Sequence, residues 1–112
     1  MLKVYGLPSC DTVRKARKWL ESQGAEHQFF AFAKMDDLEA KAAEWLAAMG
    51  PEALVNPRSR NFKALSEDEQ ALVLAGAPAL LAATPQLMKR PIIETKGKTL
   101  AGFNEAEWQA LI

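Results

Sequence analysis

The residue most capable of nucleophilic chemistry in this chain of 112 is Cys10, its single cysteine. The sequence places it where a short strand passes into a helix, beside Asp11 and Thr12. A thiol at a helix N-terminus lies near unpaired backbone N–H groups and the positive end of the helix dipole, and both stabilise the thiolate. Arg14, one helical turn further, adds positive charge on the same side. This pattern predicts a reactive thiolate, and a buried structural cysteine remains the open alternative.

Residue 13 decides the type of thiol chemistry that is available. A dithiol redox motif needs a second cysteine three positions after the first, and Val13 stands there. Disulfide chemistry would therefore be monothiol: Cys10 would form a mixed disulfide, and a thiol from outside the chain would resolve it. One cysteine also excludes an internal disulfide and a multi-cysteine zinc site, so no metal is expected.

Three arginines are the other candidates for a binding site. Arg58, Arg60 and Arg90 could gather around a carboxylate or an oxyanion, because a guanidinium pairs with both in a bidentate way. The alternative for each is a solvated surface position. The one histidine, His27, lies far from Cys10 in sequence, so we expect a packing or surface role for it and no Cys–His pair.

Composition limits the classes of protein that this chain can represent. Apolar residues make up 49% and charged residues 25%, as in ordinary globular domains, and 112 residues suit a single domain. Fourteen basic and fourteen acidic residues give zero net charge, so nucleic acid is not an expected partner. No apolar run approaches the roughly 18 residues of a membrane span, and no secretory signal is recognisable. We expect a cytoplasmic monomer that does not bind membranes.

Hydrophobic periodicity predicts a β-α-β unit at the start of the chain. Residues 2–6 favour a strand, and residues 27–32 favour a second strand. Between them, from Cys10 to about Gln23, Val13, Ala16 and Leu20 recur at helical spacing. Such a crossover predicts two parallel strands.

The rest of the chain predicts a helical stretch followed by a β-β-α unit. Capping boxes mark three helix starts, at Asp36, Ser66 and Asn104. We therefore expect a mixed α/β fold, in which the two ends share one sheet and residues 36–89 form a helical insertion. The expected elements are helices from 36 to 49 and from 66 to 75, a loop at 51–61, helical turns at 79–83 and 85–89, strands at 91–95 and 99–101, and a final helix after residue 104.

Four segments, quoted in chain order, carry a resemblance to a known family: YGLPSCDTVRKARKWL, LVNPRSRNFKAL, KRPIIE and TLAGFNEAEW. In order and spacing they resemble the arsenate-reductase-like (ArsC) family, in particular its YffB branch, which lies next to the Spx transcriptional regulators. The resemblance implies a thioredoxin-like fold with a helical insertion and a reactive thiol at Cys10. It also matches Arg14, Arg58 and Arg90 to basic residues of the family, and Pro91 to a cis proline.

The resemblance leaves three functional hypotheses. The first is a glutathione-dependent monothiol reductase, in which Cys10 and Arg14 act catalytically while Arg58, Arg90 and the backbone at Pro91 hold glutathione as co-substrate. The second is a non-enzymatic regulator or binding protein similar to Spx, with RNA polymerase as partner. The third is arsenate reduction. Two residues disfavour it: Gly6 occupies the position where the family's arsenate reductases carry a histidine, and Gly102 the position where they carry a third arginine.

Overall fold

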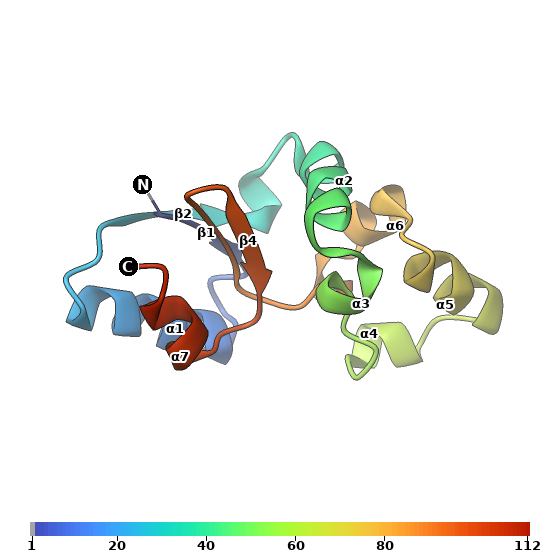
Figure 1. Cartoon of the computed structure of the whole chain (residues 1–112). Coiled ribbons are helices and arrows are strands. Elements are labelled where there is room, and N and C mark those ends of the chain that lie inside the picture. Colours follow the sequence, from blue (N-terminus) through green and yellow to red (C-terminus); the bar gives the residue numbers. More distant parts are fainter. Residues whose placement is uncertain (1) are drawn as a thin grey trace. The chain divides into compact units, whose positions relative to one another are not determined.

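The computed structural model describes residues 2–112, which form two compact units (Figure 1). The first unit joins residues 2–35 to Arg90–Ile112, and the second is Asp36–Lys89. The second unit therefore interrupts the first in sequence, between its second and third strands. That the two units make up one folding domain stays a prediction.

The first unit contains a four-stranded mixed sheet. Its strands β1 (Leu2–Gly6), β2 (His27–Ala31), β3 (Ile92–Thr95) and β4 (Lys98–Ala101) lie in the order β2-β1-β3-β4. Strand β1 runs parallel to β2 and antiparallel to β3, and β4 runs antiparallel to β3. Helix α1 (Asp11–Ser22) connects the two parallel strands, as predicted. This topology confirms the mixed α/β, thioredoxin-like architecture with an inserted helical segment.

The core of the first unit lies between one face of this sheet and the helices α1 and α7 (Glu105–Gln109). The predicted cap of α7 is present, because the Glu107 backbone N–H donates to Asn104 Oδ1 over 3.0 Å. The predicted staple is present too, with Phe103 and Trp108 ring centroids 5.0 Å apart. Each large side chain buried here contributes on the order of 2 kcal/mol. The buried core residues are Leu2, Val4, Ala16, Leu20, Ile93, Trp108 and Leu111.

Gly6, at the end of β1, permits a close approach between segments of this unit. A Cβ atom on Gly6 would lie 2.8 Å from Val13 Cγ2 and 3.8 Å from the Cα of Pro91. The first distance is too short for two carbon atoms, so only glycine lets the strand end pack this tightly on the first turn of α1. Residue 6 thus controls how closely the first turn of α1 packs on the end of β1.

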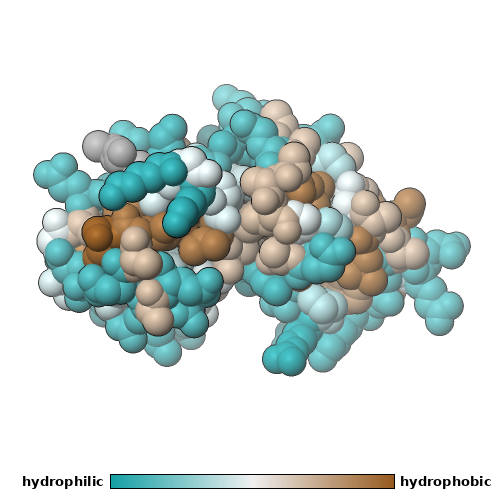
Figure 2. All heavy atoms as spheres, viewed as in Figure 1, coloured by the Kyte–Doolittle hydropathy of each residue, from teal (hydrophilic) through white to brown (hydrophobic). Residues whose placement is uncertain are grey.

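The second unit is all helical apart from an isolated bridge between Val55 and Met88. The capping box predicted at Ser66 is confirmed, because Ser66 Oγ accepts from the Glu69 N–H and Glu69 Oε1 accepts from the Ser66 N–H. On α5 the side chains of Leu72 and Leu74 are 56% and 49% exposed, and Figure 2 shows apolar surface over α5 and α6. The elements are α2 (Leu38–Met49), α3 (Pro51–Leu54), α4 (Arg60–Lys63), α5 (Glu67–Leu74), α6 (Pro78–Ala83) and the 3-10 turn η2 (Pro85–Leu87).

Three predicted elements of the chain differ from the structure. The loop expected at 51–61 is wrong: Pro51 opens α3, and Ser59 caps α4 by accepting from the Phe62 N–H over 3.1 Å. The helix expected to begin at Asp36 begins two residues later, and Asp37 makes no side-chain cap bond. The strand expected at 27–32 ends at Ala31, where the 3-10 turn η1 (Phe32–Lys34) follows.

We predict that Gly6→Ala lowers the free energy of unfolding by about 1–3 kcal/mol, because the new methyl group overpacks a buried contact. Val13 is fully buried and β-branched, so it cannot turn its methyl groups away. Urea denaturation of both proteins measures the loss. In a Val13→Ala background, where the clashing methyl groups are absent, Gly6→Ala should cost far less; an equal cost in both backgrounds would contradict this origin.

Candidate functional site

Cys10 is the N-cap residue of α1, as the sequence predicted. Its backbone is extended (φ −74°, ψ 127°), and its carbonyl accepts the first helical hydrogen bond, from the Arg14 N–H over 3.0 Å. Its own N–H donates to the Leu7 carbonyl over 3.0 Å, which closes the turn that leads out of β1. Cys10 as a whole is neither fully buried nor fully exposed. This placement fits a nucleophile better than a structural core residue.

The electrostatic surroundings of the thiol favour its ionised form. Partial burial alone raises the pKa of Cys10, because desolvation disfavours the thiolate. Hydrogen bonds from the Val13 N–H, the Arg90 side chain and the Thr12 N–H oppose this effect, and the positive charge of Arg90 adds to them. The net result is a pKa lowered from the ordinary value of a cysteine thiol. The fraction of Cys10 that is ionised at neutral pH is therefore larger in the folded chain than in an unfolded chain.

Arg14 is not among the groups that lower the pKa of Cys10, although we expected it to be one of them. Its guanidinium pairs with the carboxylate of Asp11 at the exposed start of α1. The guanidinium that hydrogen-bonds the thiol and lowers its pKa belongs to Arg90, about eighty residues further along the chain. Arg14 lies one helical turn after Cys10, and its exposed pair with Asp11 offsets part of its charge.

Arg90 and Pro91 come directly before β3 and lie beside the end of β1. The peptide bond between them is cis, as the resemblance implied. Pro91 is buried and has no N–H, and its carbonyl oxygen accepts from the Gly102 N–H over 2.8 Å. A peptide that paired with the backbone at Pro91 as an added strand could therefore donate a hydrogen bond only to the second lone pair of this carbonyl oxygen. Gly102 has φ 85°, a left-handed conformation that disfavours an arginine at that position.

Arg58 and Arg60 belong to the second unit, where both side chains are exposed. Arg58 lies in an Asx turn, because its N–H donates to Asn56 Oδ1 over 3.1 Å. Arg60 is the first residue of α4. The role predicted for Arg58 in holding glutathione stays a prediction.

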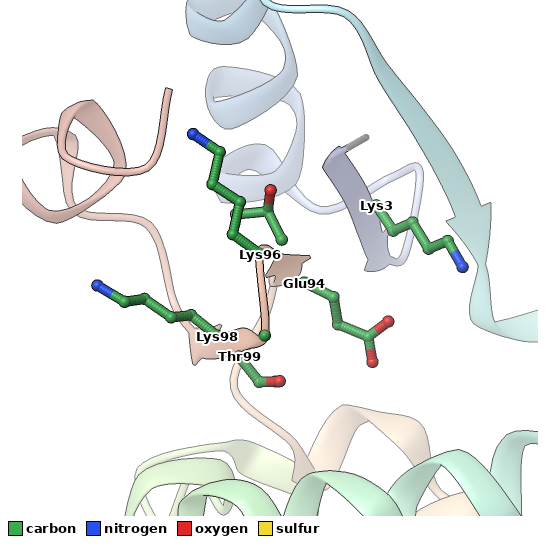
Figure 3. A pocket seen from close by; sticks show the side chains of 7 residues that line it. Lys3, Glu94, Lys96, Lys98 and Thr99 are labelled. Atoms are coloured by element: carbon green, nitrogen blue, oxygen red, sulfur yellow. The ribbon is translucent and has the colours of Figure 1, made fainter.

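A cavity of about 330 Å³ lies at the opposite end of the sheet from Cys10, around the turn between β3 and β4 (Figure 3). Lys3 and Glu94 extend to one side in this view, whereas Lys96 and Lys98 extend to the other. The strand register explains the divergence, because Lys3 pairs with Glu94 on one face while Lys98 pairs with Thr95 on the other face. The lysines therefore do not converge on a single ligand.

Residues 2–112 contain no group of three or more His, Cys, Asp or Glu side chains that could hold a metal ion. Among the same residues, no helix is long and apolar enough to cross a membrane.

Comparison with known proteins identifies the family. A protein-family model described as the ArsC family matches residues 5–111. The chain belongs to the ArsC family. This ArsC-family chain is 41% identical over 112 residues to an uncharacterized protein of Haemophilus influenzae, with 98% of this chain and 97% of that protein covered. It is also 33% identical to the global transcriptional regulator Spx of Streptococcus pyogenes, over 100% of this chain and 85% of Spx.

Two solved structures of ArsC-family type resemble the fold over nearly its whole length. A YffB protein matches with a TM-score of 0.89 and 31% identity, covering 99% of this chain and 98% of its own. An arsenate reductase (ArsC) related protein from Brucella melitensis matches with a TM-score of 0.76 and 36% identity, covering 97% and 92%. These relatives and Spx carry different names, so membership of the family does not by itself define the reaction of this chain.

We predict that Arg90→Gln raises the pKa of Cys10, because it removes a hydrogen bond and a positive charge from the thiolate. Below that pKa, each pH unit lowers the thiolate fraction about tenfold, so alkylation by iodoacetamide at pH 6–7 should slow. The pH dependence of the alkylation rate measures the shift. Arg14→Gln, which changes the same charge one turn into α1, should shift the profile less. A larger shift for Arg14→Gln than for Arg90→Gln would contradict the geometry.

Proposed function

We propose that this ArsC-family protein is a glutathione-dependent monothiol reductase with Cys10 as its nucleophile. The observation that carries the proposal is the lowered pKa of Cys10, produced by the Val13 and Thr12 N–H groups and by Arg90. A thiolate on a residue that is only partly buried can attack a disulfide. Val13, which stands where a resolving cysteine would be, is fully buried, so the second thiol must come from another molecule.

The proposed reaction is two successive thiol–disulfide exchanges. The Cys10 thiolate attacks the glutathione sulfur of a mixed disulfide between glutathione and a substrate. A disulfide forms between Cys10 and glutathione, and the substrate leaves as a thiolate that takes a proton from water. A second glutathione thiolate then attacks the bound glutathione sulfur, which releases oxidised glutathione and regenerates the Cys10 thiolate. In net terms the incoming glutathione thiolate and the mixed disulfide become oxidised glutathione and the substrate thiolate: the substrate sulfur is reduced, and the sulfur of the incoming glutathione is oxidised.

Arg90 has two tasks in this cycle. It stabilises the Cys10 thiolate before attack, and Cys10 is again a thiolate when it leaves in the second exchange. A leaving thiolate of lower pKa departs faster, so the same contacts favour both exchanges. In this proposal a carboxylate of glutathione pairs with Arg90 beside the thiol, and Arg14, whose charge Asp11 offsets in part, adds positive potential from the next turn.

A second candidate is a regulator that acts by binding a partner protein, which the 33% identity to Spx favours. In that role Cys10 would sense oxidants through its own modification, since residue 13 cannot form a disulfide with it. The two candidates differ in turnover: a reductase consumes glutathione catalytically, whereas a sensor reacts once per chain.

We predict Cys10-dependent turnover in an NADPH-coupled assay with glutathione, glutathione reductase and a glutathione mixed disulfide of 2-mercaptoethanol. Cys10→Ser should lose activity to background, because a serine hydroxyl is not ionised at neutral pH. Ser9→Ala, which changes the neighbouring exposed residue, is the matched control and should keep most of the activity. Equal activity of wild type and Cys10→Ser would remove the mechanism. Rapid alkylation of Cys10 with no turnover would favour the regulator.

A further inference from the structure

Positively charged side chains follow Cys10 along one face of α1. Arg14, Arg17 and Lys18 follow Cys10 by four, seven and eight residues, which places all three on its side of the helix. Together with Glu21 they line a shallow hollow of about 210 Å³. We call Arg14, Arg17 and Lys18 the basic face of α1.

The charges on the basic face are only partly neutralised. Arg14 pairs with Asp11, but among residues 2–112 neither Arg17 nor Lys18 forms an ion pair. The Arg17 guanidinium lies 4.1 Å from the ring centroid of Phe29, so packing holds its position, and its buried Nε has no hydrogen-bond partner among the described residues. A fixed and unpaired guanidinium is a ready partner for a carboxylate.

The charge of the whole first unit supports an anionic partner. That unit, residues 1–35 and 90–112, contains nine Lys and Arg against six Asp and Glu, whereas residues 36–89 contain five against eight. The neutral chain therefore concentrates positive charge in the unit that carries the thiolate. Such an asymmetry raises the rate at which anionic molecules meet the site.

We propose that the basic face of α1 docks an acidic peptide segment next to the cysteine of a glutathionylated protein substrate. This inference rests on the proposed function, since it assigns a substrate class to the same thiol. Arg14 lies about 6 Å and Lys18 about 12 Å along the helix from Cys10, and an extended peptide advances about 3.3 Å per residue. The matching substrate carries Asp or Glu two to four positions from its reacting cysteine.

Glu21 limits the length of the segment and its chemical class. Its carboxylate stands at the far end of the hollow, where it repels further negative charge. Asp11 stands at the near end, paired with Arg14. A nucleic acid strand, with its evenly spaced phosphates, would place negative charge beside the carboxylates of both Asp11 and Glu21. A peptide with two or three acidic residues is short enough to contact only the cations between these two carboxylates. The pattern therefore favours an acidic peptide over nucleic acid.

Binding is tested first, separately from turnover, by NMR titration of the full ¹⁵N-labelled chain. The probes are three peptides with serine in place of the reacting cysteine and with Glu, Gln or Lys two to four positions on either side. The Glu peptide should shift amide signals of residues 14–21 and bind roughly tenfold more tightly than the Gln peptide, since each surface ion pair contributes up to about fivefold. Added salt should weaken this preference.

Charge variants then assign the effect to the basic face. Lys18→Gln should weaken binding of the Glu peptide about threefold, and Glu21→Gln should strengthen it by a similar factor, as expected for exposed ion pairs. Lys98→Gln makes the same change of charge at the far end of the sheet and should change the affinity little. All three residues are exposed, so none of these changes disturbs the core.

The NMR titration tests the docking proposal and the coupled assay tests the proposed reductase, so one proposal can be rejected without the other. Equal binding of the Glu and Gln peptides, shifts outside residues 14–21, or equal effects of Lys18→Gln and Lys98→Gln would overturn the docking proposal. Tighter binding of a short single-stranded oligonucleotide than of the Glu peptide would also overturn it. Glutathione alone should shift amides near Pro91; if it shifts residues 14–21 instead, the basic face holds glutathione and the proposal is wrong. Loss of turnover with binding intact would reject only the proposed reductase.

Discussion

Partial burial disfavours the charged form of the Cys10 thiol, so its ionisation depends on groups that three separate segments bring to it. Strand β1 ends at Gly6, and the turn after it places Cys10 at the N-terminus of α1, where backbone N–H groups face the sulfur. The antiparallel pairing of Tyr5 with Ile92 brings the start of β3, and therefore Arg90, beside that turn. Glycine at position 6 lets the first turn of α1 pack directly on the end of β1, beside Pro91. The order of strands in the sheet thus controls the charge on one sulfur atom.

A single thiolate with no second cysteine beside it has a restricted chemistry. It can exchange with a disulfide, but another thiol must complete the cycle, and the selectivity must come from groups around the sulfur. The first unit supplies such groups as positive charge, in Arg90 at the thiol and in the basic face along α1. The chain is similar both to a transcriptional regulator and to an arsenate reductase related protein. One scaffold can serve different partners when the residues around the thiol differ.

Much of the fold could be predicted from local patterns. The spacing of Val13, Ala16 and Leu20 indicated α1, and the caps at Ser66 and Asn104 marked true helix starts, because these signals act within a few residues. The short helices within 51–61 were missed, since four residues show no periodicity. The sequence also indicated Arg14, and not Arg90, as the arginine that lowers the pKa of the thiol, for a related reason. Helical spacing identifies neighbours on one helix, whereas the contact with Arg90 depends on strand pairing across the chain.

The most direct test of a nucleophilic Cys10 is mass spectrometry of the intact chain after reaction with one equivalent of a glutathionylated peptide, without free glutathione. We expect release of the peptide thiol and appearance of a chain that carries one glutathione, in amounts equal to each other. Added glutathione should then return the chain to its unmodified mass. A chain that remains unmodified while the mixed disulfide stays intact at neutral pH would contradict the account, because a thiolate stabilised by Arg90 and the α1 N-terminus must react under these conditions.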